Sequence, residues 1–204
     1  MTKRTTPAMP EHNADPSKVI DWFDYFFGED EPANEYRYLS NFYRGDPIHA
    51  LGREWMDGEH LFAALKATTH EDFLKVANAK TPSETKALGR TITLREDWAE
   101  VRLDVMRWVL SLKFTLDRPE GRALLETGDA MLIEGTWWND TVWGLDRETG
   151  MGRNWLGTLL MARRAELRAE VAGAKPFDYT YVMETALGLH PSKPRNFRPK
   201  TVKV

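Results

Sequence analysis

An apolar stripe at helical spacing is the feature that most constrains the fold of this chain. Between residues 98 and 112, large apolar side chains recur every three or four positions, which places them along one face of a helix. These side chains belong to Trp98, Val101, Val105, Trp108 and Leu112. Thr93 and Glu96 have the spacing of a capping box, so the sequence predicts a helix that opens at this pair. A chain organised around such a helix is expected to be mainly α.

Further helices are predicted on both sides of this one. A capping box with proline at the first helical position predicts a short helix from Thr81 that ends at Gly89. Apolar spacing and terminal signals predict three more helices, at residues 59–67, 119–126 and 154–171. The last of these is expected to expose a face rich in arginine and glutamate. Two short strands are predicted, at residues 131–134 and 178–183.

The chain is expected to hold one domain between two extensions, because 204 residues suit a single domain. Residues 1–36 are predicted to be an N-terminal extension that is partly disordered. Within it, residues 20–27 are so aromatic that they are expected to pack on the core or on a partner, with the core favoured. Residues 37–171 form the predicted main domain. Residues 172–204 form a C-terminal extension with a basic tail, which is interpreted as a solvated tail or as a phosphate-binding arm.

Composition excludes several classes of protein. The absence of cysteine excludes disulfides and thiolate metal sites and favours the cytoplasm. None of the five histidines has a partner at zincin spacing and no glycine-rich phosphate loop follows a strand, so neither a metal nor a cofactor is predicted. No apolar run could span a bilayer, and no membrane partner is expected. The net charge of −3 gives no general attraction to nucleic acid, and the oligomeric state stays open.

Several short motifs occur in the order and spacing of the NADAR (YbiA-like) family, which the chain resembles from about residue 38 to residue 164. The motifs lie at residues 38–43, 58–66, 79–90, 124–128, 140–144 and 152–161, with Trp98, Arg102 and Met106 between them. The chain departs from the family at Ala63, where glutamine is usual, and at residues 145–146, where a second glycine is usual. Both departures concern substrate detail.

The resemblance implies a compact, single-domain, mainly α fold with short β elements, in which residues 37–171 form a NADAR-like catalytic domain. It also implies an N-glycosidase, a hydrolase acting on N-glycosyl bonds. Members of the family act on ribosylamino-pyrimidine phosphates of riboflavin synthesis or remove ADP-ribose from guanine in DNA. The expected partner is therefore a nucleotide-like or ADP-ribosyl substrate, with ADP-ribosylated DNA as one form. A module that binds ADP-ribose or a nucleotide without cleavage, and an interaction role, are the alternatives.

Three residues of the matching motifs are expected to be catalytic: Glu59, Lys66 and Asp140. Taken alone, Glu59 would be an acid at a helix start and Lys66 a solvated lysine. Cleavage builds positive charge on the ribose, so one carboxylate is expected to stabilise C1 while another group protonates the leaving amine. Glu59 and Asp140 suit that pair. In a second route, the sugar opens to an imine and Lys66 takes it over as a Schiff base, while Glu59 moves the proton.

Nine further residues of the motifs are expected to bind the substrate. They are Asn41, Phe42, Arg44, His60, Arg90, Trp98, Trp143, Gly144 and Asn154. The two asparagine amides suit ribose hydroxyls or phosphate, and the two guanidinium groups suit phosphate oxygens. The two tryptophans could stack on a base, although Trp98 fits the apolar stripe of its helix equally well.

Overall fold

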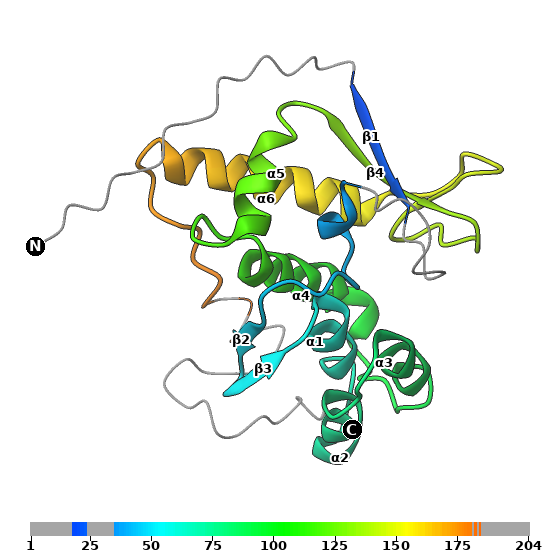
Figure 1. Cartoon of the computed structure of the whole chain (residues 1–204). Coiled ribbons are helices and arrows are strands. Elements are labelled where there is room, and N and C mark those ends of the chain that lie inside the picture. Colours follow the sequence, from blue (N-terminus) through cyan, green and yellow to red (C-terminus); the bar gives the residue numbers. More distant parts are fainter. Residues whose placement is uncertain (1–17, 24–34, 181, 183, 185–204) are drawn as a thin grey trace, which may run out of the picture. The chain divides into compact units, whose positions relative to one another are not determined.

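The computed structural model describes residues 18–23, 35–180, 182 and 184 of the chain (Figure 1). The chain divides into two compact units. Unit 1 consists of residues 1–36 and 114–177, and unit 2 of residues 37–113 and 178–204. The predicted disorder of the first residues and the basic tail at residues 193–204 lie outside the described residues.

Unit 2 is built around helix α1 (Gly58–Ala64), which packs against three other helices (Figure 1). These are α2 (His70–Ala77), α3 (Pro82–Gly89) and α4 (Trp98–Lys113). A short 3-10 helix, η1 (Arg37–Leu39), and an antiparallel hairpin of β2 (Ile48–Ala50) and β3 (Arg53–Trp55) precede α1. The side chains of Trp55, Leu61 and Leu65 are fully buried in this unit. The apolar positions of α1 thus form its core.

The predicted helices of unit 2 are confirmed, with corrections at their ends. Helix α3 has the predicted bounds, and Thr81 caps it by accepting the N–H of Glu84 at 3.1 Å. The capping box predicted for α4 is wrong, because that helix begins at Trp98. Thr93 instead donates its N–H to the Asp72 carboxylate, and its carbonyl accepts the N–H of Thr68. Long-range hydrogen bonds therefore outweigh the local capping signal.

The sequence patterns did not predict α2 or the β2–β3 hairpin. A local signal for α2 was present, because Thr69 accepts the N–H of Asp72, three positions later, as an N-cap. The hairpin strands have three residues each, which is too short for a recognisable alternation.

Unit 1 contains a small parallel sheet with β4 (Met131–Thr136) at its centre. On one side β4 pairs with β1 (Val19–Phe23), and on the other with β5 (Leu145–Asp146) (Figure 1). Ile20 and Trp22 of β1 are buried, so the predicted packing of the aromatic segment is confirmed for the part that is described. Residues 24–27 of that segment lie outside the described residues.

Two helices complete unit 1: α5 (Pro119–Glu126) and α6 (Trp155–Val171), which packs on both α5 and β4. The expectation of an exposed face rich in arginine and glutamate on α6 is wrong at Arg163 and Arg164, which are buried. Their guanidinium groups donate to the carbonyls of Phe114 and Ala130, at 2.9 Å in each case. The two arginine side chains thus satisfy main-chain carbonyl groups inside unit 1.

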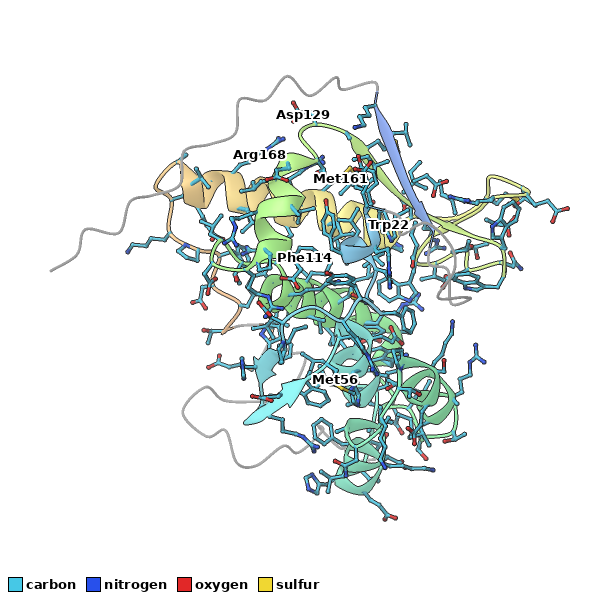
Figure 2. The ribbon with its side chains drawn as sticks, in the orientation of Figure 1. Trp22, Met56, Phe114, Asp129, Met161 and Arg168 are labelled. Carbon is cyan, nitrogen blue, oxygen red and sulfur yellow. The ribbon has the colours of Figure 1, made fainter. Side chains whose placement is uncertain are left out.

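An arginine side chain also holds the last turn of α6 in place. Figure 2 shows Arg168 directed toward Asp129, which lies between α5 and β4, and their charged atoms are 2.6 Å apart. The strand predicted for residues 178–183 is wrong over its described residues, since Thr180 and Val182 have helical backbone.

Asn154 joins α6 to the sheet of unit 1. Its backbone is left-handed, with φ of 48°, immediately before the helix. Its side-chain amide donates to the carbonyl of Leu132 at 2.8 Å and accepts the N–H of Glu134 at 3.1 Å. The amide thereby pairs with β4 as a neighbouring strand would. Gly144 lies close to the same strand, because a Cβ there would be 2.3 Å from the Glu134 carbonyl oxygen.

We predict that Asp57→Ala lowers the free energy of unfolding by about 1 kcal/mol, because Asp57 is the N-cap of α1 and accepts the His60 N–H at 2.8 Å. Asp57→Asn should retain most of the stability, since asparagine is an equally good cap. Urea unfolding of the three proteins tests both statements.

The difference in stability between the wild-type protein and Asp57→Asn should depend on pH. Burial raises the pKa of Asp57, and this outweighs the hydrogen bond from His60 and the nearby positive charges, which lower it. The folded state therefore holds the proton more tightly than the unfolded state, so this carboxyl group destabilises the fold as pH rises through its pKa. Relative to Asp57→Asn, the wild-type protein should lose stability as pH rises from the usual range of an aspartate carboxyl group through the raised pKa of Asp57. A constant difference would contradict the prediction.

We also predict that Asn154→Ala unfolds at lower temperature than the wild-type protein, because two buried main-chain groups of β4 lose their partners. Asn154→Asp is informative as well: a carboxylate accepts the Glu134 N–H but cannot donate to the Leu132 carbonyl. Its melting temperature should lie between those of the other two proteins. Equal melting temperatures for all three would show that the pairing does not stabilise the fold.

Candidate functional site

Glu59 and Lys66 come together in unit 2, as the sequence predicted. Glu59 is the second residue of α1, whereas Lys66 lies in the turn just beyond the helix, where its N–H donates to the Ala63 carbonyl. The Lys66 Nζ atom is 3.9 Å from Oε1 of Glu59. Their side chains are only 20% and 14% exposed, respectively. A carboxylate and an ammonium group thus face each other with little solvent around them.

Two aromatic rings adjoin this pair. The Lys66 Nζ atom is 4.8 Å from the ring centroid of Phe62 and 6.0 Å from that of Trp98. The two rings are tilted by 53°, with centroids 5.0 Å apart. Trp98 is half-buried at the start of α4, so it serves both as a packing residue and as a neighbour of Lys66. Contacts of this kind favour a cation and exclude water from around it.

Main-chain hydrogen bonds connect Lys66 to Trp98 through Arg95. Arg95 donates its N–H to the Lys66 carbonyl at 3.0 Å and accepts the Trp98 N–H at 3.1 Å. Its guanidinium group is buried and forms two hydrogen bonds to the Asp97 carboxylate, at 2.6 and 2.8 Å. The sequence did not single out Arg95, because nothing local distinguishes it from a solvated arginine.

Asn41 lies beside the start of α1 and is buried. Its carbonyl accepts the Glu59 N–H at 2.9 Å, and its side-chain N–H donates to the Met106 sulfur at 3.1 Å. The side-chain oxygen has no hydrogen-bond partner among the described residues. It would lie 2.9 Å from a Cβ at Gly58. The structure therefore places Asn41 behind Glu59, as a support for the helix start.

Both predicted phosphate-binding arginines belong to unit 2. Arg44 is exposed, donates to the Lys80 carbonyl at 2.9 Å and lies 3.7 Å from the Asp57 carboxylate. Arg90 is exposed just after α3. Phe42 is half-buried, with the Lys86 ammonium 5.5 Å from its ring centroid.

His60 points into the core of unit 2. Its Nε2 atom hydrogen-bonds to the Val76 carbonyl at 2.9 Å, and its ring meets Trp55 edge to face at 5.6 Å. These contacts tie α1 to α2 and to the hairpin. The substrate contact of His60 stays a prediction, and the contacts that the structure shows for it are with the core.

The remaining predicted residues belong to unit 1. Asp140 is half-buried, and its Oδ1 atom accepts the N–H groups of Val142 and Trp143 at 3.1 and 2.9 Å. It thus stabilises the turn that carries Trp143. The amide of Asn154 and the position of Gly144 are both explained by their contacts with β4. These contacts show that both residues support the fold of unit 1, and their role in substrate binding stays a prediction.

No group of three or more metal-binding side chains occurs among the described residues. None of the helices in the described part of the chain is long and apolar enough to cross a membrane.

Comparison with known proteins agrees with the resemblance. The NADAR domain model matches residues 25–168, a range with parts in both units. N-glycosidase YbiA of Escherichia coli is 35% identical over 140 residues, which cover 68% of this chain and 86% of that protein. An N-glycosidase of Nostoc punctiforme is 35% identical over 149 residues, or 71% of this chain and 92% of that protein.

A riboflavin biosynthesis protein of Vibrio vulnificus is 34% identical over 154 residues. The match covers 74% of this chain but only 40% of that longer protein. Among solved structures, the NMR structure of the E. coli protein YbiA matches with a TM-score of 0.63 and 31% identity, covering 82% of this chain and 98% of that one. The predicted mainly α fold with short β elements is confirmed, and the chain belongs to the NADAR domain family.

Proposed function

We propose that this chain hydrolyses the bond between a ribose C1 and an exocyclic amine, and that Glu59 and Lys66 carry out the reaction. The observation that carries the proposal is the pairing of these two groups, 3.9 Å apart and largely buried beside Phe62 and Trp98. The predicted enzyme class, a hydrolase of N-glycosyl bonds, is confirmed by the relatives named as N-glycosidases.

In the direct route, Glu59 stabilises the positive charge that develops at C1 as the bond to the amine breaks. A general acid protonates the leaving amine, and water then adds to C1. A carboxylate acts strongly here because few water molecules screen it. Asp140 stays the predicted second carboxylate, and one of its oxygens accepts the N–H groups of Val142 and Trp143.

In the Schiff-base route, the exocyclic glycosylamine first opens to an imine. The neutral Lys66 amine then attacks C1, forming a bond from Nζ to C1, and the bond from C1 to the exocyclic nitrogen breaks. Glu59 first takes a proton from the Lys66 ammonium group and gives it to the imine nitrogen. After the attack it carries a second proton from Nζ to the same nitrogen, which leaves as the neutral amine. Water finally hydrolyses the Lys66 imine and releases the sugar. The separation of 3.9 Å is longer than a hydrogen bond, so the two groups must approach further for this transfer.

For the substrate, we favour a ribosylamino-pyrimidine phosphate, because relatives in Vibrio vulnificus and Zea mays carry riboflavin biosynthesis in their names. ADP-ribosylated guanine, free or in DNA, is the second substrate and contains the same type of bond. The half-buried Trp98 ring beside Lys66 suits a planar base in either case. A module that only binds a nucleotide would have no need of the buried Glu59–Lys66 pair. A cytoplasmic location stays a prediction.

We predict that Glu59→Gln lowers kcat for release of ribose phosphate from a ribosylamino-pyrimidine phosphate by about 10²-fold or more, because it keeps the shape but removes the charge. ADP-ribosylated guanosine and ADP-ribosylated single-stranded DNA, offered in parallel, identify the preferred substrate. The matched control is Glu71→Gln, an exposed acid in the first turn of α2. Wild-type turnover by Glu59→Gln on every substrate would refute the proposal.

For Lys66, we predict that borohydride added during turnover reduces the imine to a stable secondary amine. Peptide mass spectrometry should then locate the sugar on Lys66. Lys66→Met should give no adduct, whereas Lys75→Met, at an exposed lysine of α2, should give the wild-type yield. Turnover without any adduct on Lys66 would leave only the direct route.

A further inference from the structure

A buried ammonium group in unit 2 takes no part in the chemistry described above. Lys113 is the last residue of α4 and is only 2% exposed. A charge in such a place is unfavourable unless other groups compensate it. The Lys113 Nζ atom donates a short hydrogen bond to the Ser40 carbonyl and lies 5.8 Å from the ring centroid of Tyr43. Lys113 therefore fastens residues 40–43 to the end of α4.

The fastened segment in turn holds the start of α1. Asn41, which follows Ser40, accepts the Glu59 N–H through its main-chain carbonyl. Its side chain donates to Met106, which lies on α4 seven positions before Lys113 and so on the same face of that helix. Helix α4 thus holds residues 40–41 at two points, two helical turns apart.

Residues 40–41 pack closely against the start of α1. A Cβ at Gly58 would lie only 2.9 Å from the side-chain oxygen of Asn41, so the Asn41 side chain lies close against the backbone of α1. Lys113 also acts on the cap of α1. Burial raises the pKa of Asp57, and the Lys113 charge is one of the influences that lower it. Removing Lys113 would thus disturb both the support of α1 and its cap.

We infer that Lys113 is a positioning residue for Glu59: its bond to the Ser40 carbonyl places the Asn41 carbonyl, which fixes the N–H and hence the side chain of Glu59. This inference rests on the proposed role of Glu59 in the reaction. A small displacement of Glu59 would change its separation from the Lys66 Nζ atom, which is only 3.9 Å, and the proposed reaction depends on that separation. A misplacement of about 1 Å can lower the rate of an enzymatic reaction by about 10²-fold.

The test is a double-mutant cycle on kcat and KM, measured with a ribosylamino-pyrimidine phosphate or with the substrate that proves preferred. Lys113→Met should lower kcat by about ten- to hundredfold with a smaller change in KM. Lys113→Arg should retain most of the activity, since a guanidinium group can donate to the Ser40 carbonyl. In the Glu59→Gln background, Lys113→Met should cause little further loss. Lys75→Met is the matched control for removal of a lysine.

Amide hydrogen exchange gives a second measure that does not depend on catalysis. In Lys113→Met, the Glu59 amide should exchange faster than in the wild-type protein, while amides of β4 in unit 1 should keep their rates. If Lys113→Met does not fold, Lys113→Gln takes its place, because glutamine keeps a polar end group but is one bond shorter than lysine and so weakens the contact with the Ser40 carbonyl.

Two results would overturn the inference: full additivity of the kcat effects of Lys113→Met and Glu59→Gln, or an unchanged exchange rate at Glu59. Failure of the proposed function has a different signature. In that case Glu59→Gln keeps wild-type turnover, while the exchange rate still decides whether Lys113 holds the start of α1.

Discussion

The buried N-terminus of α1 is the constraint on which the candidate site depends. The first N–H groups of a helix have no partner within it, and here solvent does not supply one. Asp57 accepts the N–H of His60, and the Asn41 carbonyl accepts that of Glu59. One acceptor is local in sequence and the other comes from a separate segment. Together they determine where α1 begins, and therefore where the Glu59 carboxylate lies.

The groups of the proposed reaction then come from a short stretch of chain that begins at this helix start. Helix α1 presents Glu59 and Phe62 and ends before Lys66, which folds back so that its ammonium group faces the carboxylate. Trp98 of α4 closes over the same lysine. Burial strengthens the interaction of these groups with each other and with charge that develops on a substrate. The same carboxylate on a solvated helix would only have offset the helix dipole.

The motifs of the NADAR family combine residues of two kinds. Glu59 and Lys66 are brought into contact in unit 2, where their pairing suits N-glycoside cleavage. In unit 1, the Asn154 amide replaces a strand partner of β4, and Gly144 allows the close approach of two main chains. A motif residue thus identifies the family equally well whether it serves chemistry or packing, and only its contacts distinguish the two.

Local signals in the sequence determined helices such as α3 and α5, because a cap, a proline at the first helical position and the helical period all act within a few residues. They also determined the family, since its motifs are short and ordered. Only the tertiary structure decided the parallel pairing of β1 with β4, the burial of Arg163, Arg164 and Lys113, and the core position of His60. Each of these depends on main-chain groups that are distant in sequence and need a partner once water is excluded, which no local pattern can reveal.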